Sequence, residues 1–288
     1  MPLRSGHLGF FAALRGKETL ALSEILHPVY PFSASHLAFL AIFLPAAVIL
    51  AAALSGKFGY SRKIIVACAI VGLLCEMEKI LFFVERSPYG YGYRLPAANL
   101  PLAMCPFQIF LIFALAFSAK LEDRRPLLAF MYPMLVGGGS VGMLLQYTYS
   151  HHGLLDFSTY RFFVYHAMLV FLGFYLYMSK PIRFAIKDYG MAVGIGTATL
   201  VFAVWINGFF GWDPRVNFLF VVRPPREGLP LLNLDRGWAV YIAQIYWISI
   251  AVFTLCYMRV IKRDAPAFAR AVKARLSAKP AAPLSDRR

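Results

Sequence analysis

The sequence predicts an all-α, polytopic membrane protein folded as a seven-transmembrane-helix bundle. Hydrophobic residues make up 60% of the 288 residues and charged residues only 15%, and the mean hydropathy is +0.63. Soluble domains carry about one quarter charged residues, so this chain has too few polar side chains to cover itself in water. The apolar residues also fall in long runs separated by short polar segments, which is typical of membrane proteins.

Seven of these runs meet or approach the length of about 20 residues that a helix needs to cross a bilayer core. They are Ser35–Leu54, Lys63–Val84, Leu100–Ala119, Pro126–Tyr147, Tyr160–Met178, Tyr189–Phe209 and Trp238–Ile261. The connections are short except for residues 210–237. That segment contains Pro214, Pro224, Pro225 and Pro230, which predict an irregular or re-entrant loop because proline disrupts helices.

The chain divides into an N-terminal extramembrane or interfacial segment (1–34), a transmembrane domain (35–261) and a basic tail (262–288). Lys and Arg are more frequent in the first, third and fifth loops and in the tail than on the other side. This bias predicts an external N-terminus and a cytoplasmic C-terminus. We expect the tail to be disordered or to lie on the membrane.

The net charge of +15 predicts contact with anionic lipid. The basic residues flank the apolar segments and form no patch alternating with aromatic residues, so nucleic acid is not expected as a partner. The protein is expected in the cell membrane as a multi-pass protein. No metal, cofactor or particular oligomeric state is indicated.

Two glycine pairs, Gly138/Gly142 and Gly190/Gly194, have the GxxxG spacing that predicts close helix packing in membranes. The run Gly137-Gly138-Gly139 lacks the Lys-Ser/Thr that would follow in a phosphate-binding loop. It indicates packing or helix flexibility instead.

In the predicted topology, polar residues from six helices gather in the outer half of the membrane. Cys105 lies five residues into the third helix and His166 six residues into the fifth, at depths of roughly 8 and 9 Å. The other polar residues near this level are Glu76, Glu78, Lys79, Gln108, Gln146, Asn207 and Gln244. Because ionisable groups in a membrane are costly, such a group of residues is a candidate functional site.

Cys105 has the surroundings of a nucleophile. Asn99 is expected to cap the third helix and Pro101 to occupy its first turn, which places Cys105 near the positive end of the helix dipole. Such a position favours the thiolate form of a cysteine. Pro106 is expected to bend the helix and open space beside the sulfur, and His166 at matching depth is the candidate base.

Other interpretations remain open for these residues. Glu76 and Lys79 are three residues apart and can form an ion pair that only holds the bundle together. A lone cysteine in an apolar helix is usually a core residue, and we interpret Cys68, Cys75 and Cys256 in this way.

The histidines outside the fifth helix allow further alternatives. His151 and Asp156 have the HxxxxD spacing of glycerolipid acyltransferases, but no acyl-acceptor motif of that family follows. His151 and His152 could also bind a metal, but no cluster of carboxylates and histidines completes the set. His36 is either an interfacial residue or part of the outer pocket.

The sequence resembles the YwaF family of bacterial integral membrane proteins, which includes vertebrate transmembrane protein 164. The similar stretches extend from about Phe32 to Tyr241. They are Phe32-Ser33-Ala34-Ser35-His36, Leu100-Pro101-Leu102-Ala103-Met104-Cys105, Phe163-Val164-Tyr165-His166, Asn207, Asn217-Phe218-Leu219-Phe220 with Pro224, and Gly237-Trp238 with Tyr241-Ile242.

The resemblance implies acyl transfer between phospholipids, with Cys105 as the nucleophile and His166 as the base. It also implies a bacterial inner membrane location. Two positions depart from the family pattern: Ala103 stands where a histidine is frequent, and Pro106 where a charged residue is frequent. These changes leave the nucleophile in place and affect the choice of acyl acceptor.

The sequence therefore predicts a Cys–His acyltransferase or transacylase acting on membrane phospholipids. Glu76, Gln108, Asn207, Asn217 and Gln244 are the candidate supporting residues, of which Gln108, Asn207 or backbone amides would hold the oxyanion. With water as the acceptor, the same site would be a lipid hydrolase. The non-enzymatic alternative is a carrier or lipid-binding protein that uses Glu76, Glu78 and Lys79.

Overall fold

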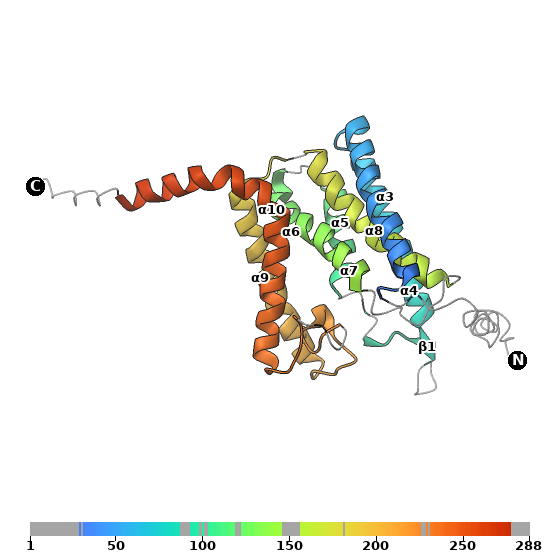
Figure 1. Ribbon diagram of the computed structural model, residues 1–288. Coiled ribbons are helices and arrows are strands. Elements are labelled where there is room, and N and C mark those ends of the chain that lie inside the picture. The colour runs from blue at the N-terminus through green and yellow to red at the C-terminus, as the bar shows by residue number, and fades with distance from the viewer. Residues whose placement is uncertain are drawn as a thin grey trace, which may run out of the picture.

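The protein is a bundle of antiparallel helices (Figure 1). The computed structural model describes residues 29, 31–86, 93–97, 100, 103–118, 122–145, 156–180, 182–225, 229 and 231–277. Its main helices are α3 (Ala34–Phe58), α4 (Arg62–Phe83), α5 (Met104–Ala116), α6 (Arg125–Pro133), α7 (Gly139–Leu145), α8 (Phe157–Met178), α9 (Ile186–Phe209) and α10 (Trp238–Ser277). A two-stranded antiparallel sheet of β1 (Glu85–Arg86) and β2 (Tyr93–Arg94) follows α4.

Five helical segments are long and apolar enough to cross a membrane. They are Ala34–Phe58, Glu122–Leu145, Phe157–Met178, Ile186–Phe209 and Trp238–Arg270. The chain is therefore a multi-pass membrane protein. Helices α4 and α5 lie where the sequence predicts them, but α4 carries three charged residues near its end and α5 has only 13 residues. The count of seven crossings and the side on which each terminus lies remain predictions.

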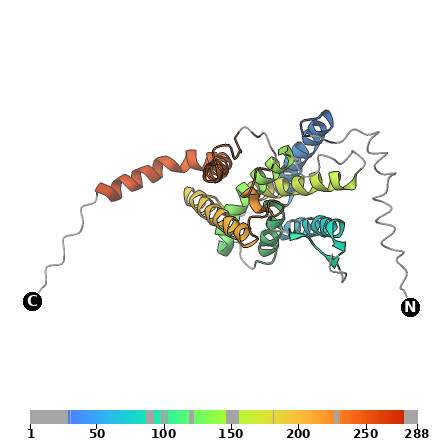
Figure 2. The same cartoon turned by 90° about the horizontal axis from the view of Figure 1, so that it is seen from below.

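Helix α8 is the central element of the described bundle. It packs against α3, α4, α6 and α7, and of the five candidate spans it is the most buried. Between α3 and α8 the rings of Phe39 and Phe163 stack with their centroids 4.5 Å apart. The α6–α7 segment, α9 and α10 pack on one another beside this layer. The two orthogonal views show this arrangement (Figure 1 and Figure 2).

A turn of π-helix (Met134–Gly138) joins α6 to α7, so the predicted fourth span is a helix with an irregular centre. The turn follows Pro133 and contains Gly137 and Gly138. Proline cannot donate the helical hydrogen bond, and single π-turns inside α-helices occur often at functional sites. The predicted flexibility of the glycine run therefore takes the form of a locally widened helix.

Two predicted boundaries differ from the structure. Helix α5 begins at Met104, with Ala103 as its N-cap, and not at Leu100. Helix α10 continues through Pro266 to Ser277, so residues 262–277 of the predicted tail are helical. The last part of α10 turns and projects away from the bundle (Figure 1 and Figure 2). The segment 210–237 is irregular in its described residues, with one short 3-10 turn, Phe218–Phe220, as predicted.

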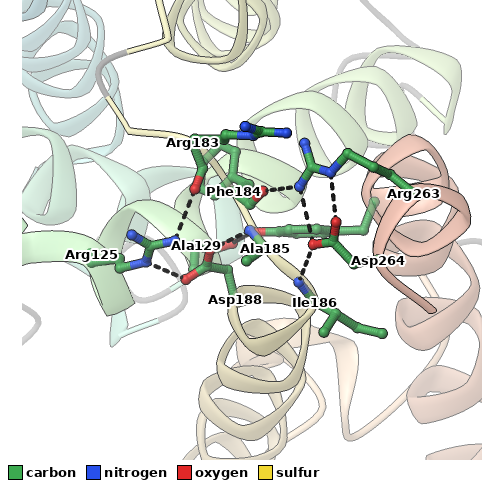
Figure 3. Close-up of polar contacts among 10 residues, drawn as sticks. Arg125, Ala129, Arg183, Phe184, Ala185, Ile186, Asp188, Arg263 and Asp264 are labelled. Carbon is green, nitrogen blue, oxygen red and sulfur yellow. Dashed lines mark hydrogen bonds and ion pairs between the residues drawn. The ribbon is translucent and has the colours of Figure 1, made fainter. Parts of the chain in front are cut away.

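A group of four charged residues, called the polar clamp below, joins the helices at the end where α6 and α9 begin (Figure 3). Arg125 of α6 donates from Nε and Nη2 to the two carboxylate oxygens of Asp188 in α9, both at 2.7 Å. Asp188 also accepts from the backbone N–H of Ala185 at 2.6 Å. In α10, Arg263 donates to the carbonyl of Phe184, and Asp264 accepts from the backbone N–H of Ile186. The clamp thus connects α6, α9 and α10.

Candidate functional site

A cavity of about 300 Å³ lies among α4, α5, the π-turn and α7, α8, the 3-10 turn Phe218–Phe220 and α10. It lies toward the end of the bundle where α4, α7 and α9 finish and α5, α8 and α10 begin, called the site end below. Most of its lining is apolar. The polar side chains that line it belong to Cys75, Glu76, Lys79, Cys105, Arg161, Tyr165, His166 and Ser249. Cys105 and His166 therefore share one cavity.

Cys105 is the second residue of α5. The first hydrogen bond of this helix runs from the N–H of Phe107 to the carbonyl of Ala103, at 3.0 Å. Pro106 has no N–H, and the N–H groups of Met104 and Cys105 precede the first helical bond, so they have no partner within the helix. The sulfur thus belongs to the first turn of α5, at the positive end of the helix dipole.

The prediction of a bend at Pro106 is wrong. Because α5 starts at Met104, later than predicted, Pro106 lies in the first turn of the helix. Proline is tolerated in the first turn of a helix, where an N–H has no helical acceptor in any case. The expected cap Asn99 and Pro101 lie outside the described residues. The position of Cys105 near a helix N-terminus is nevertheless retained, and it is closer to that terminus than the sequence predicted.

His166 is buried in α8, and its hydrogen bonding determines its tautomer. Nδ1 lies 2.8 Å from the carbonyl oxygen of Phe162. A carbonyl oxygen only accepts, so Nδ1 carries the proton, and Nε2 of the neutral ring keeps its lone pair. In the described part of the chain no hydrogen bond occupies Nε2. His166 is therefore oriented by its backbone with one basic nitrogen available.

Gly142 of α7 gives the His166 ring its space. A Cβ atom at position 142 would lie 2.5 Å from Cδ2 and 2.7 Å from Nε2 of the ring. The predicted close packing is thus found at Gly142. At Gly190 and Gly194, by contrast, a Cβ would meet nothing within 4 Å, so the same spacing produces no packing within the described chain.

Tyr165 links the two candidate catalytic helices. Its hydroxyl donates to the carbonyl oxygen of Cys105 at 2.6 Å, so the residue next to His166 in sequence is fastened to the residue that carries the thiol. Sequence reasoning missed this role because a tyrosine in an apolar helix has many possible partners. Its only sequence signal was its place in the stretch Phe163-Val164-Tyr165-His166.

Two ion pairs lie in or beside the cavity. Lys79 pairs with Glu76, as the spacing predicts, and both line the cavity. Arg161 pairs with Glu78 across α8 and α4, and Arg161 also lines it. Lys79, Glu76 and Arg161 are called the charged wall below. Arg161 was not among the predicted site residues, although a cation at the start of an apolar helix was a usable signal.

The other four predicted supporting residues do not line the cavity in the described structure. Gln108 is 1% exposed, and its amide has no hydrogen-bond partner among the described residues. Asn207 is buried and bonds both the N–H and the carbonyl of Phe218. Asn217 bonds the backbone of Val222 and Arg223, and Gln244 accepts from the N–H of Asn233 at 3.2 Å.

Asn207, Asn217 and Gln244 thus hold the loop between α9 and α10. This loop supplies Leu219, Phe220, Pro225 and Leu232 to the cavity. The three residues act on the shape of the cavity wall, and Asn207 does not lie where the expected oxyanion contact would be.

Of the alternative histidine site, the structure describes only Asp156. Asp156 caps α8 by accepting from the N–H of Ser158 at 2.8 Å. His151, His152 and Gln146 lie outside the described residues. Over the described ranges, no group of three or more His, Cys, Asp or Glu residues is arranged to hold a metal ion.

His36 is a buried structural residue. Nδ1 accepts from the N–H of Phe32 and Nε2 donates to the carbonyl of Met143, both at 2.8 Å. It joins the start of α3 to α7 and does not line the cavity in the described structure. Of the three cysteines interpreted as core residues, Cys68 is buried, whereas Cys75 lines the cavity.

Comparison with known proteins gives one match. Residues 31–257 match the TMEM164 family. No curated protein and no solved structure matches the chain.

Proposed function

Because the chain belongs to the TMEM164 family, we propose that it is a membrane-embedded acyltransferase that moves an acyl chain between phospholipids through a thioester on Cys105. The observation that carries this proposal is the shared cavity of Cys105 and His166. The protonated Nδ1 of His166 leaves Nε2 as the base, which is the arrangement a Cys–His pair needs.

In the first half of the reaction, Nε2 of His166 takes the proton of the Cys105 thiol. The sulfur attacks the ester carbonyl of a phospholipid, and a carbon–sulfur bond forms as the carbon–oxygen bond to glycerol breaks. The released glycerol oxygen takes the proton from His166. In the second half, the hydroxyl of a lysophospholipid gives its proton to Nε2 and attacks the thioester. A new ester forms, and the sulfur leaves and regains the proton.

The start of α5 supports this chemistry electrostatically. The N–H groups of Met104 and Cys105 are the donors best suited to the oxyanion, because Asn207 is occupied by Phe218 and Gln108 does not line the described cavity. Preorganised donors of this kind stabilise the charge that develops on the carbonyl oxygen. The apolar lining, which includes Val141, Ile245 and Ile248, is suited to an acyl chain.

The narrower assignments rest on the sequence: the bacterial inner membrane on the resemblance to the YwaF proteins, the seven crossings on the apolar runs, and the orientation on the Lys and Arg bias. We place the protein in a bacterial inner membrane with seven crossings and with the site end outward. The substrates would then enter from the outer leaflet, and the basic end of α10 would face anionic lipid on the cytoplasmic side.

The test compares Cys105→Ala with Cys75→Ala, because both cysteines line the cavity. Purified proteins are incubated with a phospholipid carrying a labelled acyl chain and with a lysophospholipid. We expect a hydroxylamine-sensitive label on wild type and Cys75→Ala, absent from Cys105→Ala, and loss of acyl exchange in Cys105→Ala alone. Absence of both thioester and exchange in folded wild-type protein would overturn the proposal.

The charged wall favours one second candidate, a non-enzymatic lipid-binding or carrier protein. In that case, lipid binding or uptake would survive Cys105→Ala and fail when Glu76 and Lys79 are neutralised. Transfer of the acyl chain to water, with no dependence on lysophospholipid, would instead identify a hydrolase that uses the same two residues.

A further inference from the structure

Two cations face the cavity at one level of the bundle. Lys79 lies four residues before the end of α4 at Phe83, and Arg161 lies four residues after the start of α8 at Phe157. Each is therefore roughly 6 Å along its helix from the site end. Their side chains are only 14% and 7% exposed. Such charges are costly in a membrane and are a mark of function.

The charges on the cavity side do not cancel. Lys79, Arg161 and Glu76 line the cavity, whereas Glu78, the partner of Arg161, is not among its described lining residues. The charged wall thus presents two positive groups and one negative group. A single anion is the complement of this surface. The apolar remainder of the lining suits an anion that belongs to an amphiphilic molecule better than a small free ion.

The position of the wall relative to the candidate catalytic pair fits a glycerophospholipid. His166 follows Arg161 by five residues on α8, so it lies roughly 7.5 Å deeper along the helix. In a glycerophospholipid the ester carbonyls are several bonds from the phosphate, toward the acyl chains. A phosphate held at Arg161 would therefore direct an ester toward the level of His166.

We infer that Lys79 and Arg161 bind the phosphodiester of the substrate lipid and so set how deeply its ester enters the cavity. This inference rests on the proposed function. Arginine and lysine are the side chains that bind phosphate, by forked hydrogen bonding and as a point charge. Glu76 and Glu78 hold the two cations in place and keep them paired before a lipid enters.

The experiment measures lipid binding separately from chemistry. It uses full-length Cys105→Ser, which cannot form the thioester, with phosphatidylglycerol and diacylglycerol of identical acyl chains as probes. Removing one cation alone would leave a buried carboxylate unpaired. The variants are therefore the charge-neutral pairs Arg161→Gln/Glu78→Gln and Lys79→Met/Glu76→Gln, and thermal unfolding confirms that each is folded.

We expect each pair of substitutions to weaken phosphatidylglycerol binding roughly tenfold to hundredfold, the range for one hydrogen bond to a charged group. Diacylglycerol binding should change less than threefold, and Arg161→Lys should restore part of the phospholipid affinity. Equal losses for both lipids, or no loss for either, would overturn the inference. The inference would also be overturned if inorganic phosphate, at the same concentration as the lipid, displaced phosphatidylglycerol, because the site would then bind the free ion.

The two proposals fail in distinguishable ways. Selective phospholipid binding without any labelled thioester on wild type would support the phosphate site and contradict the acyltransferase proposal. A labelled thioester with no selectivity between the two lipids would support the acyltransferase proposal and contradict the phosphate site.

Discussion

The polar clamp and the charged wall lie at opposite ends of the bundle and differ in what surrounds their charges. In the clamp, the side chain of Asp188 is 0% exposed. Its carboxylate accepts hydrogen bonds from Nε and Nη2 of Arg125 and from the backbone N–H of Ala185 (Figure 3). In the charged wall, Lys79 and Arg161 also have carboxylate partners, but they line a cavity. Paired charges are thus present at both ends, and those of the charged wall face the cavity described above.

A buried charge in a membrane helix is therefore, by itself, an ambiguous sign of function. The charges of the clamp pair with one another and with backbone groups and so join α6, α9 and α10, which is a role in assembly. The charged wall lines the same cavity as a thiol and a histidine with an available nitrogen, which is why we propose that its charges bind a ligand. A cavity and an unoccupied hydrogen-bonding atom distinguish the two cases.

The largest expected effect is on catalysis, in the variant His166→Asn. The asparagine amide can replace Nδ1 as the donor to Phe162, but it has no counterpart of Nε2. We therefore expect acyl exchange to fall by about 10²–10⁴-fold, the contribution of a general base. The change is measured as the rate of labelled-chain transfer per folded protein.

The matched control is His36→Ala, since both ring nitrogens of His36 are engaged by the backbone. It should lower the free energy of unfolding by roughly 1–3 kcal/mol, because it leaves the buried carbonyl of Met143 and the partly buried N–H of Phe32 without their side-chain partner. The transfer rate per folded molecule should stay within about threefold. A large rate loss in His36→Ala, with none in His166→Asn, would reverse the roles assigned to the two histidines.

The next effect is on stability, in the variant Asp188→Ala. This change leaves the guanidinium of Arg125 and the N–H of Ala185 without their acceptor. Breaking a fully buried ion pair costs about 3–5 kcal/mol; since the Arg125 side chain is 28% exposed, we expect about 2–3 kcal/mol. Denaturant unfolding in detergent measures it, and acyl exchange by the remaining folded protein should be unchanged.

Asp213→Asn is the control for the clamp, because Asp213 forms a pair with Arg215 on the exposed loop. Hydrogen bonds from the side chain and backbone N–H of Arg215 lower the pKa of Asp213 to about 2. Any stabilisation is thus present above the unfolded-state pKa near 3.9 and is lost as the pH falls through about 2. At pH 7 the pair is fully ionised, and solvent screening should make the unfolding midpoint indistinguishable from wild type. A shift as large as that of Asp188→Ala would contradict the distinction between clamp and surface.

The helical bundle could be predicted from the sequence because apolar runs of bilayer length report directly on membrane-spanning helices. Helix ends were harder. Leu100-Pro101-Leu102 is as apolar as the helix it precedes, so hydropathy placed the start of α5 four residues too early. In the same way, the polar composition of residues 262–277 concealed the continuation of α10. Hydropathy does not record where backbone hydrogen bonds begin or end.

The residues of the candidate site could be predicted only from their depth along each helix, which shows which side chains lie at the same level of the bundle. Cys105, His166 and Glu76 were placed at one level and line one cavity. Asn207 and Gln244 were placed at the same level, but their orientation toward the α9–α10 loop depends on the direction of each side chain around its helix. Tyr165 was missed because the partner of its hydroxyl, the carbonyl of Cys105, lies on another helix. Depth along a helix does not show in which direction a side chain points or which helices are neighbours, and both are needed to predict a site.

The most selective test of that geometry is Gly142→Ala, for which we expect a smaller loss of exchange than for His166→Asn. A Cβ at this position would come within 2.7 Å of Nε2 of His166, so the ring must move away from its position. Overpacking of this kind costs about 1–3 kcal/mol of stability. Misplacement of a catalytic group by about 1 Å can reduce the rate as much as 10²-fold, so we expect acyl exchange to fall about 10- to 100-fold.

Gly194→Ala is the matched control, because it is the same substitution in a helix at a position where nothing lies within 4 Å. It should leave exchange unchanged and raise stability by about 0.5–1 kcal/mol, since alanine favours helix over glycine. If Gly142→Ala loses stability but not exchange, the glycine serves only packing, and Nε2 of His166 is not the base. If both fall while Gly194→Ala is unaffected, the position of the ring, and not helix flexibility, limits the reaction.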